Sequence, residues 1–316
     1  MKNLLLSVAA LTLAAPLFTG SAMGQSAQTA PAKLIAPNLI AEGRHMTVLN
    51  AQNLSDRRYS VPAPSADATQ FDFTLKGYVF GIRLITANYM GYEDGDRYAA
   101  YTDMRTTGLG ALVKKMDIWS VTSGRILADG TPRPDFHVQQ NTDKKNRRVE
   151  MNYDHDARSV DVAIVPPLGS QGVPPASPEQ RYSAFDTISA LLRMTHKGRQ
   201  EASQLCSGRV PIFDSKQHYT LRLAPVGTDR VKFLGDRDEA IHCHAYYEPI
   251  AGYDPEDLPN AEEAGTPVDL YFRYYPEVDM HVPVRFSYKI SGFRAVIKMD
   301  DLTLVTPEGT VISQES

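Results

Sequence analysis

VPVRFSYKI, residues 282–290, carries the pattern that decides the fold of this chain. Its apolar side chains alternate with polar or small ones: Val282, Val284, Phe286, Tyr288 and Ile290 are interleaved with Pro283, Arg285, Ser287 and Lys289. A period of two is typical of a β-strand with one face buried and the other in water. The stretch therefore predicts a half-buried strand of an antiparallel sheet.

The same alternation recurs through most of the chain. VDLYFRYY at 268–275 and FDFTLK at 71–76 show it clearly, and weaker copies lie near 79–90, 98–103, 115–127, 134–140, 147–153, 158–165, 218–224, 230–235, 239–248 and 293–304. Two helices interrupt the strands, one over 106–115 and a longer one over 179–197, which Ser177 caps and Gly198 ends. The chain is thus predicted to be mainly β, a curled antiparallel sheet or unclosed β-barrel of about a dozen strands with one packed α-helix.

The two ends of the chain differ from this strand-rich middle. Lys2 and the apolar run 4–18 predict a signal peptide over 1–24, cleaved near Gly24 and directing the protein to the periplasm. Residues 25–66 are rich in Ala, Pro, Ser and Asn and are expected to form a flexible arm. The β domain is expected over 67–304, followed by a C-terminal tail over 305–316. No later stretch has the length of apolar sequence that a transmembrane segment needs.

Charge and composition exclude some classes of partner. The chain of 316 residues has 33 basic and 37 acidic side chains and a formal net charge of −4. Without a basic excess it is not expected to bind nucleic acid through the phosphate backbone. A disordered protein, a collagen and a disulfide-dense miniprotein are also excluded by the composition.

Cys206 and Cys243 are the two cysteines of the chain. In an exported protein such a pair most simply forms one disulfide. A zinc site is the alternative, because His242 and His244 flank Cys243 and His218 lies between the cysteines. Alternation weakens it, since on a strand the two flanking histidines share one face while the cysteine points to the other. We therefore predict a disulfide and neither a metal nor a cofactor.

One face of a curled sheet encloses either a ligand or the protein's own side chains. Five aromatic residues and one isoleucine, on strands and on the long predicted helix, are candidates for lining a ligand site: Tyr182, Phe185, Ile188, Tyr274, Phe286 and Tyr288. The alternative is that these residues form an ordinary core, which is the commoner fate of aromatic side chains on strands.

Several longer segments carry a family likeness. TTGLGALVKKMDIWSVTSGRILADGTPRPDFH at 106–137, YSAFDTISALLR at 182–193, CSGRVPIFDSKQHYTLRL at 206–223 and CHAYYEPIAGY at 243–253 together resemble a proteobacterial periplasmic family, domain of unknown function 3108. The resemblance implies a β-spiral, distantly similar to the carriers that move lipoproteins to the outer membrane, with oxidised cysteines. It implies no catalytic residue.

We therefore expect a non-enzymatic periplasmic protein that supports the cell envelope by binding a lipid, lipoprotein or protein partner on its curled sheet. The alternative is a metal-assisted periplasmic hydrolase that uses His218, His242 and His244. A third interpretation is an interaction module whose concave face is filled by its own helix.

Overall fold

The computed structural model describes residues 61–108, 110–111, 115–142, 146–195, 198–290 and 293–315. The predicted signal peptide and almost all of the predicted arm lie outside the described residues. Positions 109 and 112–114 of the helix predicted over 106–115 also lie outside them.

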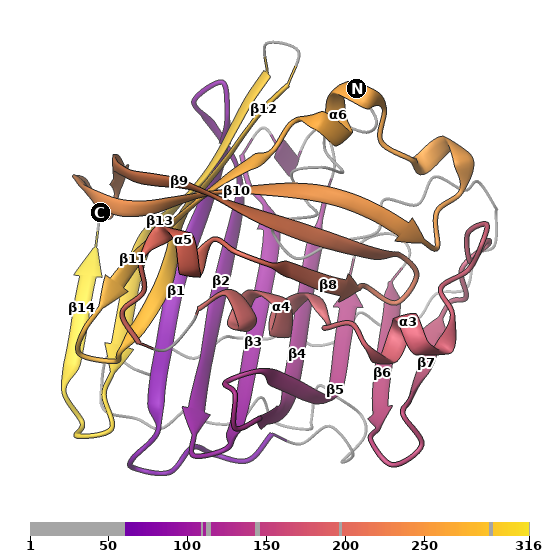
Figure 1. Ribbon diagram of the computed structural model, residues 1–316, viewed down its shortest axis with the longest axis horizontal. Helices are drawn as coiled ribbons and strands as arrows, with labels where there is room; N and C mark the ends of the chain where they lie inside the picture. Colours follow the sequence, from indigo (N-terminus) through magenta and orange to yellow (C-terminus); the bar gives the residue numbers. More distant parts are fainter. Residues whose placement is uncertain are drawn as a thin grey trace.

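The described chain forms one antiparallel 14-stranded sheet in the order β7-β6-β5-β4-β3-β2-β1-β13-β12-β11-β10-β9-β8, with β14 added beside β13 (Figure 1). The strands are β1 Thr69–Val79, β2 Ile82–Asp94, β3 Arg97–Thr106, β4 Asp117–Ile126, β5 Pro132–Asn141, β6 Arg147–Asp154, β7 Ser159–Val165, β8 Arg209–Phe213, β9 His218–Phe233, β10 Asp236–Ala251, β11 Val268–Tyr275, β12 Met280–Ile290, β13 Phe293–Val305 and β14 Val311–Glu315. The predicted mainly antiparallel, unclosed sheet is confirmed.

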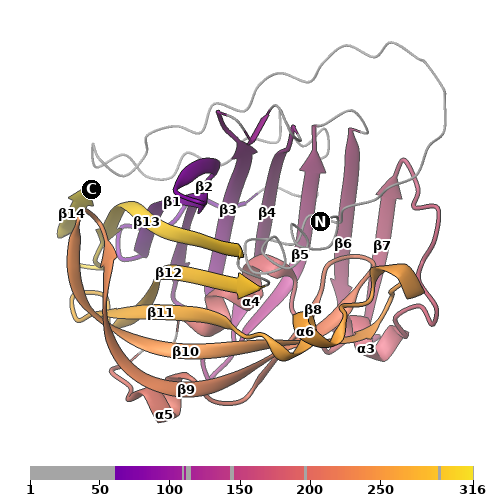
Figure 2. The ribbon, with the colours of Figure 1, turned by 90° about the horizontal axis from the view of Figure 1, so that it is seen from above.

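The sheet curls until its two ends approach each other without pairing (Figure 2). Strand β8 at one end is covered by the segment between two helices. The Phe185 amide donates to the Pro211 carbonyl at 3.0 Å, and the Phe213 amide donates to the Phe185 carbonyl at 2.8 Å. These bonds satisfy an edge that would otherwise be open to pairing with another chain.

The helix predicted over 179–197 is wrong as a single element. It is divided into α3, Pro178–Tyr182, and α4, Thr187–Met194. The break arises because Phe185 is held in extended pairing with β8 and Asp186 begins a new helix, its carboxylate accepting from the amides of Ile188 and Ser189. Short helices α5, Ala202–Leu205, and α6, Ala261–Gly265, and the 3-10 turn η2, Pro255–Asp257, complete the chain.

Helix α4 fills the concave side of the sheet. It contacts β3, β4 and β5 on one wall and β8 on the other, and lies between these walls in Figure 2. The main apolar cluster holds residues of β1 to β4 and of β8 to β13. It also holds the buried side chains of α4: Ile188, Ala190, Leu191, Leu192 and Met194. The core is therefore closed by the protein's own helix.

The domain extends beyond the predicted boundaries at both ends. Val61 is 4% exposed and packs with Ala68 and Tyr92, and the Tyr92 hydroxyl donates to the Pro62 carbonyl at 2.8 Å. The segment 305–316, predicted as a tail, contains β14. Strand β12 pairs with β13 only as far as Lys298, and β14 pairs with β13 from Asp301 to Val305. Strand β14 thus provides hydrogen-bond partners for the backbone of β13 beyond the end of β12.

Candidate functional site

Strand β10 places His242 and His244 on one face of the sheet and Cys243 on the other. Cys243 is fully buried in the main apolar cluster, whereas His244 is in part exposed on the outer face. The opposite orientation inferred from alternation is therefore observed, and the cysteine does not join the histidines.

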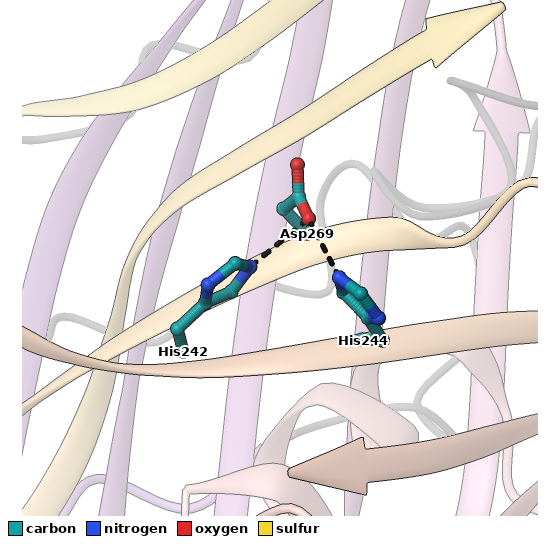
Figure 3. Close-up of side chains that lie close together, drawn as sticks. All are labelled: His242, His244 and Asp269. Carbon is teal, nitrogen blue, oxygen red and sulfur yellow. Dashed lines mark hydrogen bonds and ion pairs between the residues drawn. The ribbon is translucent and has the colours of Figure 1, made fainter. Parts of the chain in front are cut away.

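Asp269 of β11 lies between the two histidines (Figure 3). One carboxylate oxygen, Oδ1, is 3.0 Å from His242 Nε2 and 3.3 Å from His244 Nε2. The register explains this meeting, because β10 residue His244 lies directly opposite Asp269 on β11. One ligand atom from each of the three side chains lies within 4.8 Å of the others.

Further polar and aromatic groups hold this cluster in place. His242 Nδ1 is 2.8 Å from an Asp229 oxygen, and the Ser287 hydroxyl donates to Asp269 Oδ2 at 2.9 Å. The Tyr271 ring stacks on the His242 ring with centroids 4.4 Å apart. Burial lowers the pKa of His242, but the carboxylates of Asp269 and Asp229 outweigh it and the net pKa is raised. Burial raises the pKa of Asp269, yet hydrogen bonds from His242 and Ser287 leave it below its ordinary value.

His218, the third histidine of the predicted hydrolase set, is not part of this cluster. It begins β9 and pairs with Ala251, whereas His242 pairs with Gly227 far along the same two strands. Its side chain is buried, and burial lowers its pKa. The three histidines of the hydrolase alternative are therefore not brought together.

The two cysteines are joined in a disulfide, with a sulfur to sulfur distance of 1.93 Å. Cys206 follows α5 and Cys243 lies in β10, so the bond attaches α5 to the inner face of the sheet. Both residues are fully buried.

The residues predicted to line a ligand site form packed clusters. Ile188, Phe286 and Tyr288 belong to the main apolar cluster, and Phe185 packs against it. Tyr182 packs in a smaller cluster beneath α3 with β6 and β7. Each of these side chains packs within one of the two apolar clusters, which is the arrangement of an ordinary core.

Tyr274 lies on the outer side of the sheet, against the prediction. The alternation that buries Val268, Leu270 and Phe272 does not continue to Tyr274, because it breaks just beyond the register shift between Tyr271 and Phe272. Tyr275 consequently enters the core, while the Tyr274 hydroxyl donates to Asp279 and its ring lies 5.0 Å from that of His281.

A cavity of about 200 Å³ lies at the C-terminal end of α4. Its walls carry both charged and apolar side chains from α4, β2 and the β4–β5 turn: Glu93, Ile126, Asp129, Gly130, Pro132, Leu192, Arg193, Thr195 and Gln200. The volume and the charged walls suit water or a small polar molecule better than an acyl chain.

A second surface gathers apolar and basic groups where two hairpins meet. Val79 pairs with Ala295, so the β1–β2 turn lies beside the β12–β13 hairpin, at the upper edge in Figure 1. Phe80 is 66% and Ile82 46% exposed at this turn. Exposed basic side chains follow on the ends of neighbouring strands, and with the two apolar residues they define the basic tip surface: Phe80, Ile82, Arg83, Arg105, Lys115, Lys289 and Arg294.

Acidic groups bound this surface and dominate the opposite end of the strands. Asp117 is exposed at the start of β4, opposite Arg105. Glu256 and Glu262 are exposed on the segment that leads into β11, so the excess of positive charge lies on the side of the two hairpins. The turns at the far end of the sheet carry Asp94, Asp96, Asp129, Asp154, Asp156, Glu277, Asp279 and Glu308. The chain as a whole is negatively charged, but the basic tip surface carries a local excess of basic side chains.

An unclosed antiparallel sheet curled around a helix, with a disulfide on its inner face, defines the class of protein. Within that class the chain belongs to the family described as protein of unknown function (DUF3108), whose model matches residues 71–291. The resemblance noted in the sequence is confirmed.

Comparison with solved structures gives a match to a beta-barrel-like protein of domain of unknown function DUF1849 from Brucella abortus. The two chains are 11% identical over 75% of this chain and 97% of that one, with a TM-score of 0.38. None of the curated proteins matches this chain. In the described part of the chain, every helix is too short or too polar to cross a bilayer.

Proposed function

We propose that the protein is an exported, non-enzymatic protein of the periplasm that supports the cell envelope by binding an anionic lipid surface through the basic tip surface. The observation that carries this proposal is the pairing of two exposed large apolar residues, Phe80 and Ile82, with exposed cations on the adjoining strand ends. Of the partners expected from sequence, this chemistry favours lipid over a lipoprotein or another protein.

Lipid surfaces are bound by the combination found here. Apolar side chains at a turn enter the boundary between headgroups and acyl chains, while lysine and arginine contact anionic headgroups. Each cation near an anionic surface contributes about 1 kcal/mol at moderate salt. The acidic turns at the opposite end of the strands are repelled by the same surface, so the charge distribution favours one orientation.

Export is supported by two features. The basic residue and apolar run at the start of the sequence have the pattern of a signal peptide. The buried disulfide between Cys206 and Cys243 suits an oxidising compartment.

A binding role, as opposed to a catalytic one, is supported by the buried titratable groups, because the contacts they make hold the fold together. Asp186 and His137 anchor α4, and buried Lys216 pairs with Asp254 at 2.6 Å to hold a loop. The concave face is occupied by α4, which leaves the outer surface and its turns for a partner.

Vesicle binding tests this proposal. The processed protein is expected to sediment with vesicles of phosphatidylglycerol and phosphatidylethanolamine but not with phosphatidylcholine vesicles, and added salt should weaken the binding. Replacing both Phe80 and Ile82 by serine should weaken it at least about tenfold, because burying each side chain contributes more than about 1 kcal/mol.

The matched control replaces Leu258 and Val311, which are 47% and 48% exposed elsewhere, by serine. This variant should bind as the unsubstituted protein does. Equal loss in both variants, or no preference for anionic vesicles, would show that the basic tip surface does not bind lipid.

A further inference from the structure

We infer that His242, His244 and Asp269 form a binding site for a Zn²⁺ ion on the outer face of the sheet. The three ligands come from β10 and β11, and the inference is independent of the lipid-binding proposal. The sequence argued against a metal because Cys243 points away from the two histidines. In the structure the third ligand is Asp269, which lies on the neighbouring strand opposite His244.

The separations of the ligand atoms suit a four-coordinate ion. Zinc to ligand distances of about 2.0–2.2 Å place tetrahedral ligands about 3.3–3.6 Å apart. Asp269 Oδ1 is 3.0 Å from His242 Nε2 and 3.3 Å from His244 Nε2. Binding therefore requires Asp269 Oδ1 to move a few tenths of an ångström away from His242, and the ligand atoms of the two histidines, which lie within 4.8 Å of each other, to settle at about 3.3–3.6 Å. A third of the His244 side chain is exposed, so this side chain has room to adjust.

The surrounding groups orient the ligands as metal sites require. A histidine that binds a metal through one ring nitrogen usually donates the other N–H to a carboxylate, and a coordinating carboxylate is itself hydrogen-bonded. Here His242 Nδ1 is 2.8 Å from Asp229, and Ser287 donates to Asp269 Oδ2 at 2.9 Å. Tyr271 stacked on His242 fixes the plane of that ring.

The ligand set indicates which ion the site takes. Two imidazoles and a carboxylate suit divalent first-row ions. They do not suit Ca²⁺ or Mg²⁺, which prefer ligand sets made of oxygen atoms only. Three protein ligands leave a fourth position for water, which is a common zinc arrangement. This fourth position opens to solvent, since Asp269 and His244 are each about a third exposed.

Equilibrium dialysis against Zn²⁺ tests the site with protein purified without a histidine tag and treated with a chelator. One Zn²⁺ per chain is expected, with a Kd at least about 100-fold weaker in H244Q. Asp229→Asn, which alters only the group behind His242, should weaken Zn²⁺ binding about tenfold. Co²⁺ bound in its place should show the intense visible absorption of a four-coordinate ion, and H244Q should lose it.

His155 provides the matched control, because its Nε2 lies 2.9 Å from Asp135 in a similar pair without a second histidine. H155Q should keep the full Zn²⁺ affinity and the Co²⁺ spectrum. Equal Kd values for H244Q, H155Q and the unsubstituted protein, or no stoichiometric binding, would overturn the inference.

Discussion

Replacing Asp186 by alanine should lower the free energy of unfolding by about 3–5 kcal/mol, because it removes the acceptor shared by several buried polar groups. Asp186 is fully buried and lies 3.2 Å from His137 Nδ1. It also accepts from the Ile188 and Ser189 amides at 2.9 and 3.0 Å and from the Thr122 hydroxyl at 3.1 Å. Alanine would leave His137 and the Ile188 and Ser189 amides without this buried acceptor, and α4 without its cap, whereas the Thr122 hydroxyl keeps the Phe136 carbonyl as an acceptor at 2.9 Å. Urea unfolding monitored by circular dichroism measures the loss.

Asn260 offers the control for the capping contribution alone. Its side chain caps α6 at an exposed position by accepting from the Glu263 amide. Asn260→Ala should therefore cost only about 1 kcal/mol. A loss below 1 kcal/mol for Asp186→Ala would contradict the role of Asp186 in anchoring α4.

The same residue predicts a dependence on pH. Burial raises the pKa of Asp186, but the His137 charge and hydrogen bonds from His137 and Ser189 outweigh burial and hold it below its ordinary 3.8. The native state thus favours the ionised form, and this contribution is complete above about pH 4 and lost as the pH falls through the lowered pKa. The stability difference between the unsubstituted protein and Asp186→Asn should shrink in acid. A difference that stays constant down to pH 2 would argue against this linkage.

Loss of the disulfide is the second large effect. The bond joins residues 37 positions apart. For a loop of that length, the loop-closure estimate assigns about 4 kcal/mol of stabilisation, through a smaller entropy of the unfolded chain. Urea unfolding of the C206A/C243A double variant should show a loss of this size, with the folded α5 less firmly attached to β10.

Treatment with a reducing agent distinguishes the loss of the disulfide from the replacement of the two cysteine side chains by alanine. Reducing agent should destabilise the unsubstituted protein and leave the double variant unchanged. Titration of the denatured, unreduced protein should find no free thiol. Two free thiols, or stability indifferent to reductant, would show that the cysteines are not bonded in solution.

Sequence alternation was sufficient to predict the fold because each strand buries one face. The strands near 71–76, 268–275 and 282–290 lie where they were predicted. The predictions that were wrong concern residues whose structure depends on segments far away in the sequence. Phe185 and Asp186 fit a helix by local pattern, but pairing of Phe185 with β8 breaks it. Tyr274 fits the alternation of β11, but the alternation breaks after Phe272 and Tyr275 takes the buried place.

The candidate sites show the same limit. His242 and His244 were recognisable as a pair on one strand face, whereas Asp269 became their neighbour only through the β10–β11 register. Phe80 and Arg83 look like an ordinary turn in the sequence, and their relation to Arg294 depends on the pairing of β1 with β13. In each case the residues could be picked out in the sequence, but that they lie close together could be learned only from the pairing of the strands.

An environment-sensitive fluorophore placed at Ile82 or Glu308 reports whether the basic tip surface binds an anionic lipid surface. These positions are exposed at opposite ends of the strands. With phosphatidylglycerol vesicles, the label at residue 82 should shift to shorter wavelength and be quenched by lipids that carry a quencher in the bilayer, while the label at residue 308 should not change. No change at residue 82, or equal shifts at both positions, would contradict the account.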